Sequence, residues 1–524
     1  MILDLEQIEP PAALDADICV AGAGAAGITL ARQFIDRGRE VVVLEGGGRE
    51  FEERSQDIYK GEILGRPYFE LDTCRLRFFG GTTNHWGGMC APLQPLDLTE
   101  RAWIPHSGSP IGVAELEPYR AQAHEILDLK APEYDPAALA PAEGLLLDLD
   151  PERLVHRVFR LSPPTRFASK YRNVLERAQN VEVYLHANVV DIRVSDDRRT
   201  TLALEVAGPD GRHLQVRARH FVLALGGIEN ARCLLNADGQ IEGGIGNQHD
   251  LVGRFFCEHP NKFAASIVTT RGEEILSAYR SLNTGGGRVL YSIGLPPSVQ
   301  EQQRTLDLTM TLHRSREPLV SPGYLALQKL MRELEKGSYS DLGDHVMAVI
   351  QDIDGAAVDA YHQLTGTLES EIWAYARCEQ APNPDSRVQL IAATDRLGLR
   401  RVGLDWRLGA SEKHTMEVAA GLLAEEVGRL GLGRVRVHDW LTDNSPEIEV
   451  KIAGGYHHMG TTRMASDPQR GVVDADCRVH GTENLYVAGS SVFPAVGFAN
   501  PTLTIVELSL RLADHLEQRL ASAA

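Results

Sequence analysis

Short apolar runs alternate with small or polar turns over the first fifty residues. Residues 18–20 are apolar and lead into a glycine-rich turn. A helical pattern then covers about residues 25–37 and stops at Gly38, a residue suited to ending a helix. Residues 41–44 are apolar without interruption, as in a strand buried on both faces of a parallel sheet. This order predicts a complete βαβ unit.

The later elements are predicted from patterns of the same kind. Near the C-terminus, residues 485–488 form an apolar strand, and Asn500-Pro501 opens a final amphipathic helix that reaches about Leu520. Another helical pattern covers 411–430. Further strands are predicted at 181–185 and 189–194, which alternate like a pair, and at 221–225 and 387–391.

The two ends of the chain therefore look like parts of one α/β layer. A chain of 524 residues exceeds the ~250 to 300 residues at which single cores stop growing, so we expect two domains. We assign the nucleotide-binding domain to residues 1–100, 180–261 and 442–524. The second domain, expected to bind the substrate, is then inserted in pieces at 101–179 and 262–441.

The first turn carries a dinucleotide fingerprint. Gly22 allows the turn from strand to helix, Gly24 lets a pyrophosphate approach the backbone beside Ala26, and Gly27 permits close packing of helix on sheet. Glu45 ends the second strand, where a carboxylate accepts hydrogen bonds from a ribose and repels a 2′-phosphate. NADP is therefore disfavoured, but the fingerprint does not separate NAD from FAD.

Composition narrows the partners. The formal net charge of -19 repels phosphate backbones and anionic lipids, so we expect no nucleic-acid partner. The N-terminal residues lack the features of a secretory signal, and no apolar run reaches the ~18 residues of a membrane span, so we expect a soluble, cytoplasmic protein. The seven scattered cysteines lack metal-binding spacing, and we expect no metal site.

Further motifs carry a resemblance to a known family. Residues 80–88 (GGTTNHWGG) resemble a glycine-rich flavin loop, and 221–230 (FVLALGGIEN) resemble the strand and glycine turn in the middle of a flavin domain. The tail 455–512, with its segments HHMGT and FANPT, looks like a C-terminal active-site block. Together these motifs resemble the glucose-methanol-choline (GMC) oxidoreductases, most of all the pyranose oxidase and bacterial sugar dehydrogenase branch. Residues 382–388 match more loosely.

The resemblance implies FAD as the cofactor. It implies an α/β fold in which a Rossmann-like FAD-binding domain contains an inserted α+β substrate-binding domain, as in GMC enzymes and p-hydroxybenzoate hydroxylase. Glycines and small hydroxyl residues let the backbone approach the flavin ring closely. Besides the dinucleotide fingerprint, the FAD contacts implied are Gly81, Thr82, Thr83, Asn84, His85, Gly87, Gly88, Val189, Gly489, Ser490, Asn500, Pro501 and Thr502.

The resemblance also assigns the catalytic residues. The family's catalytic histidine stands three residues before a Gly-Thr pair, which corresponds to His457, and a histidine of near-neutral pKa is suited to remove a hydroxyl proton. His458 then stands one residue too close to the Gly-Thr pair to match the family's catalytic histidine. The reverse assignment, with His458 as the catalytic residue, stays open. Asn500 corresponds to the second active-site position, where its amide can hydrogen-bond the substrate oxygen but cannot act as a base. His259 is a weaker candidate for lining the site.

The expected reaction is oxidation of an alcohol group, in a sugar, glycoside or polyol, by proton abstraction and hydride transfer to flavin N5. The electron acceptor (oxygen, a quinone or a redox protein) and self-association into a homo-oligomer stay open. For His85 three roles stay open, namely a covalent bond to the flavin, a non-covalent contact and packing. Two other classes compete: a redox-silent FAD-containing lyase and a monooxygenase fed by NAD(P)H, although the sequence shows no second dinucleotide fingerprint.

Overall fold

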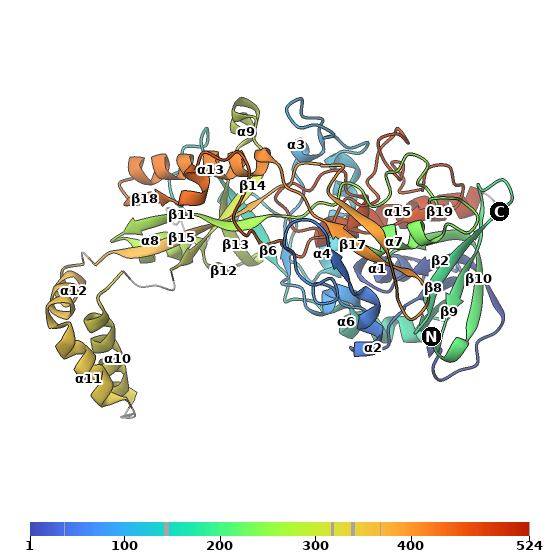
Figure 1. Cartoon of the computed structure of the whole chain (residues 1–524), viewed down its shortest axis with the longest axis horizontal. Helices are drawn as coiled ribbons and strands as arrows, with labels where there is room; N and C mark the ends of the chain where they lie inside the picture. Colours follow the sequence, from blue (N-terminus) through green and yellow to red (C-terminus); the bar gives the residue numbers. More distant parts are fainter. Residues whose placement is uncertain (36, 141–145, 316–318, 337–340, 367, 523–524) are drawn as a thin grey trace.

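The computed structural model describes residues 1–522 except 36, 141–145, 316–318, 337–340 and 367. Within these residues the strands form two eight-stranded sheets and one three-stranded sheet. Both chain termini lie beside the first large sheet, and the second large sheet lies toward the opposite end of the molecule (Figure 1).

The first sheet has a parallel part and an antiparallel extension. In spatial order the parallel part consists of β1 (Ile2–Asp4), β7 (Val181–Leu185), β3 (Val41–Leu44), β2 (Ala13–Ala21), β10 (His213–Leu223) and β19 (Leu485–Val487). Beside the first half of β10, an antiparallel meander adds β9 (Thr201–Ala207) and β8 (Asn188–Val194). The carboxyl ends of β2, β3, β10 and β19 therefore meet at one edge of the sheet.

Helices from distant parts of the chain cover this sheet. α1 (Ala25–Phe34) connects β2 to β3 and packs against the last helix, α15 (Thr502–Ser522). α4 (Glu117–Ile126) packs on α15, and α6 (Phe167–Arg177) packs on α1. Two helices from the stretch 101–179 thus lie against the nucleotide-binding layer.

The turn between β2 and α1 requires its glycines. Gly22 has a φ of +106°, in the left-handed region that side chains rarely adopt. A Cβ atom on Gly27 would lie 1.8 Å from the Gly22 carbonyl oxygen, so the helix could not approach the turn as closely with any other residue there. These two positions bring the N-terminus of α1 to the edge of the sheet.

The second sheet is antiparallel. In spatial order it contains β18 (Arg434–Val437), β11 (Asn261–Thr269), β15 (Ser370–Cys378), β14 (Leu308–Arg314), β13 (Gly287–Gly294), β6 (Val155–Leu161) and β5 (Met89–Cys90), with β12 (Ser281–Thr284) paired to β13. α13 (Ala410–Arg429) and α8 (Gly272–Tyr279) pack against it. Along β15 the alternate residues Ile372, Ala374 and Ala376 are buried in one hydrophobic cluster with residues of α13. The residues between them face the other side.

The third sheet is small and consists of β16 (Arg387–Thr394), β17 (Arg400–Asp405) and β4 (Gly61–Ile63). α7 (Glu229–Asn236), which follows β10, packs against β16 and β17. Buried apolar side chains form two large clusters, one around the first large sheet and one around the second. The remaining short elements are α2 (Glu53–Gln56), α3 (Pro95–Leu98), α5 (Pro136–Leu139), α9 (Pro297–Gln303), α14 (Asp439–Thr442), η1 (Asp57–Tyr59), η2 (Gly81–Asn84), η3 (Val113–Glu115), η4 (Pro209–Gly211) and η5 (Ser490–Val492).

A helical arm projects from the second sheet between β14 and β15. It consists of α10 (Pro322–Lys336), α11 (Leu342–Gln351) and α12 (Ile353–Thr365), and it extends away from both large sheets (Figure 1). α11 has no buried residue, and Ile350 on it and Leu364 on α12 are 58% and 87% exposed. The arm therefore presents an apolar stripe to solvent. Among the described residues, no helix is both long and apolar enough to cross a membrane.

Several predicted elements are confirmed and others need correction. β2, α1 and β3 form the expected βαβ unit, although α1 ends at Phe34, earlier than predicted, and residue 36 lies outside the described residues. The strands at 181–185 and 189–194 exist but do not pair with each other, because β7 aligns in parallel with β3 whereas β8 aligns with β9. β10 begins at His213 rather than at 221. The final helix begins at Thr502, two residues beyond the predicted start at Asn500.

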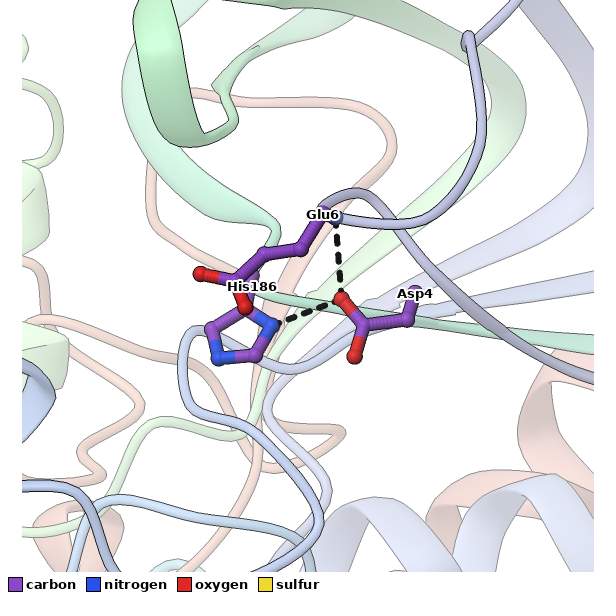
Figure 2. A group of neighbouring side chains, drawn as sticks. All are labelled: Asp4, Glu6 and His186. Carbon is purple, nitrogen blue, oxygen red and sulfur yellow. Dashed lines mark hydrogen bonds and ion pairs between the residues drawn. The ribbon is translucent and has the colours of Figure 1, made fainter.

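An ionic cluster ties β1 to the turn between β7 and β8. Nδ1 of His186 lies 2.7 Å from Asp4 (Figure 2). Its Nε2 lies 3.0 Å from Glu52. Asp4, Glu6 and His186 lie close enough together to suit a metal ion, but Glu6 pairs with Arg54 and both ring nitrogens of His186 already face carboxylates. Burial opposes protonation of His186, but the hydrogen bonds to Asp4 and Glu52 outweigh it and raise the pKa.

This cluster predicts a pH-dependent contribution to stability. Because the pKa of His186 is raised in the folded state, its contribution is fully present below the unfolded value of ~6.5 and is lost as the pH rises through the folded value. His186→Gln should lower the free energy of unfolding by roughly 1 to 3 kcal/mol at pH 6, the worth of charged hydrogen bonds, and by less at pH 9. Urea denaturation at the two pH values measures this, and an equal loss at both would show that His186 is neutral in the fold.

Candidate active site

A cavity of about 580 Å³ opens where the carboxyl ends of the parallel strands meet. Ligands of open α/β sheets bind at such an edge. It is lined by most of the residues predicted from the sequence, namely Gly22, Gly24, Ala26, Glu45, Gly81, Thr82, Thr83, His85, Gly87, Gly88, Val189, His457, Gly489, Ser490, Asn500, Pro501 and Thr502. Two of the predicted cofactor contacts do not line it, and neither does His259, the weaker candidate for lining the site. Gly27 instead packs against Gly22, and Asn84 donates a hydrogen bond to the Phe79 carbonyl.

One end of the cavity has the features of a nucleotide site. The Glu45 carboxylate is 7% exposed and accepts hydrogen bonds from the backbone N–H groups of Ala23, at 3.0 Å, and Gly47, at 2.9 Å. Each of its oxygens keeps a further lone pair for a ribose hydroxyl. The N-terminus of α1 adjoins this carboxylate, and a helix N-terminus favours phosphate.

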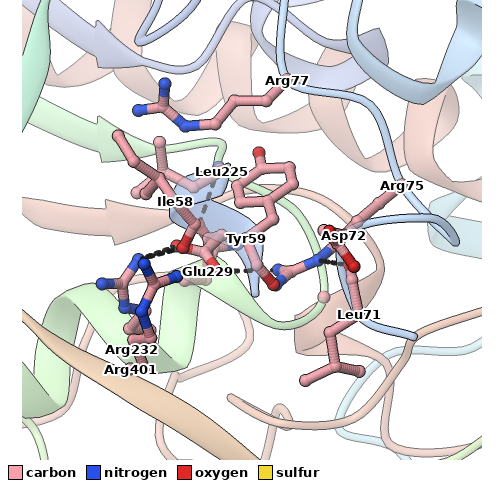
Figure 3. A network of polar contacts seen from close by, with 12 residues as sticks. Ile58, Tyr59, Leu71, Asp72, Arg75, Arg77, Leu225, Glu229, Arg232 and Arg401 are labelled. Carbon is pink, nitrogen blue, oxygen red and sulfur yellow. Dashed lines mark hydrogen bonds and ion pairs between the residues drawn. The ribbon is translucent and has the colours of Figure 1, made fainter. Parts of the chain in front are cut away.

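Next to this end, the cavity is lined by an arginine-rich wall formed by Tyr59, Arg75, Glu229 and Arg232 (Figure 3). No sequence motif predicted its arginines. Glu229 lies 2.7 Å from Arg75 and 3.1 Å from Arg232, and the Arg75 guanidinium lies 4.0 Å above the ring of Tyr59. Burial alone would raise the pKa of Glu229, but Arg232 and Arg75 lower it below its ordinary value. The Glu229 carboxylate is therefore charged, and it pairs with the charged guanidinium groups of Arg75 and Arg232. Its residues come from separate segments, so only the fold brings them together.

The glycine-rich loop 80–88 crosses the first turn. A Cβ on Gly81 would lie 3.2 Å from the Cα of Gly24, which places this loop directly against the dinucleotide turn. Trp86 donates from its indole nitrogen to the Thr165 carbonyl at 2.7 Å, and Arg166 donates to the Trp86 carbonyl at 3.0 Å. These bonds fix the loop and leave His85 at the cavity wall, where burial and Arg166 lower its pKa.

At the other end, two histidines form a hydrogen-bonded chain. Nε2 of His259 lies 2.9 Å from the Gly497 carbonyl oxygen, and Nδ1 of His259 lies 2.8 Å from Nδ1 of His457. Burial, and then Arg377, lower the pKa of His259 to about 4. Burial, and then His259 and Arg377, hold the pKa of His457 well below its ordinary value. Both rings are therefore neutral at pH 7.

The chain fixes the tautomer of each ring. A carbonyl oxygen only accepts, so Nε2 of His259 carries the proton and its Nδ1 is an acceptor. His457 must then donate from Nδ1, which leaves its Nε2 with a free lone pair. The sequence ranked His259 as a weak candidate. In the structure it contacts His457 directly.

The Glu258 carboxylate holds this segment in place. It is fully buried and accepts hydrogen bonds from the N–H groups of His259 at 2.8 Å, Gly455 at 2.7 Å and His457 at 2.9 Å, and from the hydroxyl of Tyr68. His458 packs its ring against Tyr68 and Phe256. Burial, and then Arg75, lower the pKa of His458 to about 3.

Arg377 orients the amide of Asn500. Its Nη1 donates to Asn500 Oδ1 at 2.8 Å, and its Nε donates to Asn261 at 3.2 Å. Because arginine only donates, the oxygen of Asn500 must face Arg377, and the amide NH₂ is left to donate elsewhere. This bond engages the side-chain oxygen of Asn500, the residue that the sequence placed at the start of the final helix. Arg377 itself lies on β15, in a region where the sequence showed no motif.

Comparisons with known proteins bear on the family. The family model described as GMC oxidoreductase matches residues 382–509, which include His457 and Asn500, and the model described as FAD dependent oxidoreductase matches residues 17–240. These matches support the GMC oxidoreductase family for this chain. The protein is an FAD-dependent oxidoreductase acting on CH–OH donors, with an α/β Rossmann-like FAD-binding domain and a substrate domain.

Individual relatives are distant. Paromamine 6'-oxidase of Streptomyces fradiae is 24% identical over 564 residues, which span 97% of this chain and 92% of the relative. The fructose dehydrogenase large subunit of Gluconobacter japonicus is 26% identical over 328 residues, which span 62% of this chain but only 52% of the relative. The crystal structure of pyridoxine 4-oxidase from Mesorbium loti aligns with 95% of this chain and 98% of its own at a TM-score of 0.55 and 16% identity.

The residues that line the cavity fit FAD. The helix N-terminus and Glu45 suit the pyrophosphate and ribose, and the cavity continues from Val189 past the glycine-rich loop to Asn500 without interruption. A Cβ on Gly87 would have no atom within 4 Å, so this glycine leaves room beside that loop for a flat ring system.

Glu45→Ala should weaken retention of FAD while leaving flavin reduction unchanged in the fraction that keeps it. The variant loses the charged acceptor for the ribose hydroxyls, which corresponds to roughly 10- to 100-fold weaker binding. Flavin absorbance after extensive dialysis measures the loss. Glu50→Ala serves as the matched control, because the Glu50 side chain is 80% exposed and pairs only with Arg172 at the surface. Full occupancy in Glu45→Ala would contradict the assignment.

Proposed function

We propose that this protein oxidises an alcohol group of a sugar, glycoside or polyol, with His457 as the base and Asn500 as a hydrogen-bond donor to the reacting oxygen. The observation that carries the proposal is the chain from Gly497 through His259 to His457, which leaves Nε2 of His457 unprotonated at the cavity. Bound FAD supplies the acceptor for the hydride of the reacting carbon, at its N5 atom.

His457 and Asn500 have different roles in the proposed reaction. Nε2 of His457 takes the hydroxyl proton, and the hydrogen bond from its Nδ1 to His259 holds the ring in the required tautomer. The Asn500 amide donates to the oxygen as negative charge develops there. Arg377 opposes positive charge on His457, but its own charge stabilises the developing alkoxide beside Asn500. The arrangement therefore favours proton removal only when a substrate oxygen is present to take the negative charge.

The substrate class is supported by the relatives and by the mouth of the cavity. Fructose and paromamine are the compounds named for two of the relatives compared above. At the cavity lining, Tyr456 is 51% exposed and stacks on Phe69 with 4.1 Å between ring centroids. A flat, half-open aromatic surface of this kind suits the C–H face of a sugar ring.

One spectroscopic experiment tests the proposal. Sugars and polyols are mixed with the purified enzyme under nitrogen, and bleaching of the flavin shows that an alcohol has been oxidised. A lyase would leave the flavin yellow, and bleaching by NADPH would indicate a monooxygenase. Admission of air then separates oxygen from a quinone or a redox protein as the electron acceptor.

His457→Ala should keep FAD and slow flavin reduction by roughly 10² to 10⁴, the contribution of a positioned base. His458→Ala is the matched control and should have a much smaller effect, because that ring packs against Tyr68 and Phe256. Anaerobic stopped-flow measurement of flavin reduction compares the two. Because the pKa of His457 is lowered, the wild-type rate should stay near its maximum as the pH falls to 6.5. A large loss in His458→Ala alone would reverse the assignment.

For His85 we propose a non-covalent contact with the flavin. The residue lines the cavity within a loop that is fixed by Trp86 and Arg166. Acid precipitation of the wild-type protein should therefore release all of the yellow colour into the supernatant. A pellet that stays yellow in wild type and turns white in His85→Ala would show instead that the histidine carries the flavin covalently.

A further inference from the structure

Three aromatic side chains of the second sheet lie outside both hydrophobic clusters. Phe263 on β11 and Trp373 and Tyr375 on β15 form an aromatic row, with ring centroids 4.7 Å apart for Phe263 and Trp373 and 4.9 Å apart for Phe263 and Tyr375. All three are half-buried. Large aromatic rings normally contribute to a core, so a row that belongs to neither cluster is available to a ligand.

The register of the sheet directs this row toward the active site. Trp373, Tyr375 and Arg377 alternate along β15 and therefore share one face, opposite to the face packed on α13. Across the ladder Phe263 pairs with Tyr375 and Asn261 pairs with Arg377, so these residues lie on the same face. Arg377 is bonded to Asn500. The row thus begins at Tyr375, two residues or about 7 Å along β15 from Arg377, which orients the amide of Asn500, and it extends about 7 Å farther to Trp373.

Polar groups flank the row on the neighbouring strand. In the register of β14, Thr311 pairs with Tyr375 and His313 pairs with Trp373, and the Thr311 hydroxyl lies 2.8 Å from Nε2 of His313. Hydroxyl and imidazole groups beside aromatic rings offer hydrogen bonds to sugar hydroxyls, while the rings contact the apolar face.

The charge at the outer end limits the ligand. Burial works against ionisation of Glu371, but hydrogen bonds from Trp373, Ser266 and Ser315 outweigh it and lower the pKa. A carboxylate therefore lies beyond Trp373, at the end of the row that is farther from Arg377. It repels an anionic group of a ligand that reaches this end of the row. The row accordingly suits a neutral group with a flat face.

We propose that the aromatic row binds the non-reacting ring of an extended, neutral glycoside whose other ring is oxidised beside His457 and Asn500. This inference rests on the proposed function and names its substrate class more closely. The length of the row and its distance from Arg377 correspond to one additional ring. The polar groups of β14 and the carboxylate of Glu371 favour an uncharged sugar ring or an uncharged aromatic aglycone over an acidic one.

Binding to the reduced holoenzyme tests the proposal without turnover. The enzyme is reduced with dithionite under nitrogen and titrated calorimetrically with D-glucose, phenyl β-D-glucopyranoside and cellobiose. We expect the wild type to bind at least one of the two extended compounds roughly tenfold or more tightly than glucose, because stacking on a ring buries about 100 Å² of apolar surface. A disaccharide preference indicates a second sugar ring, and a preference for the phenyl glycoside indicates an aromatic aglycone.

Variants connect this preference to the row. Trp373→Ala and Tyr375→Ala should lose the preference, with Kd for the extended compound rising roughly 10- to 100-fold and Kd for glucose unchanged. Trp373→Phe should restore most of it, because a flat ring remains. Tyr361→Ala is the matched control, since Tyr361 lies on α12 and is 64% exposed. FAD content and the melting temperature verify that each variant is folded.

Any of three results overturns the inference. One is a wild type that binds the extended compounds no better than glucose, and another is an unchanged preference in Trp373→Ala and Tyr375→Ala. A parallel loss of affinity for glucose and the glycosides would likewise show that the row only supports the sheet. Bleaching of the flavin by alcohols under nitrogen is measured separately, so the proposed function stands or fails independently of these titrations.

Discussion

The Glu258 carboxylate is the contact on which the active site depends. Three backbone N–H groups and one hydroxyl converge on it, from the segment before β11, from the segment 455–457 and from Tyr68. These segments are about two hundred residues apart in the chain. A buried carboxylate is costly unless its lone pairs are satisfied, so the four donors and the acceptor hold one another in position. The meeting of His259 with His457 follows from that constraint.

The electrostatics of the site follow from the same burial. Two adjacent histidines could not both be charged, and burial together with Arg377 keeps both rings neutral. With neutral rings, the single carbonyl of Gly497 is enough to set both tautomers. On the opposite side, Arg377 sets the direction of the Asn500 amide. In the proposed mechanism, the base His457 and the hydrogen-bond donor Asn500 therefore lie on separate elements. Each is oriented by a group that does not itself react.

Local signals were sufficient to predict the nucleotide layer, because glycines at a turn and apolar runs act over a few residues. The β2–α1–β3 unit and the position of Glu45 at the end of β3 could be predicted in this way. The glycine-rich loop 80–88 was placed by the family resemblance, and it lines the cavity. Arg377, Glu258 and the arginine wall could not, since their roles arise from contacts between distant segments. The pairing of β7 with β3 instead of β8 could not be predicted for the same reason. The neighbour of a strand depends on contacts with segments that are distant in the sequence. The domain boundaries and the catalytic roles remain predictions.

The arm formed by α10 to α12 has a consequence for how this chain can vary. β14 and β15 are already joined beneath it by a complete antiparallel ladder, and the Ser315 N–H bonds to the Glu371 carbonyl at 3.0 Å where the arm departs. The strand pair is therefore held together by its own hydrogen bonds. The arm is an insertion in the connection between the two strands. Evolution, or an engineer, can lengthen, shorten or exchange that insertion at the outer end of β15 while the inner end continues to hold Arg377 against Asn500.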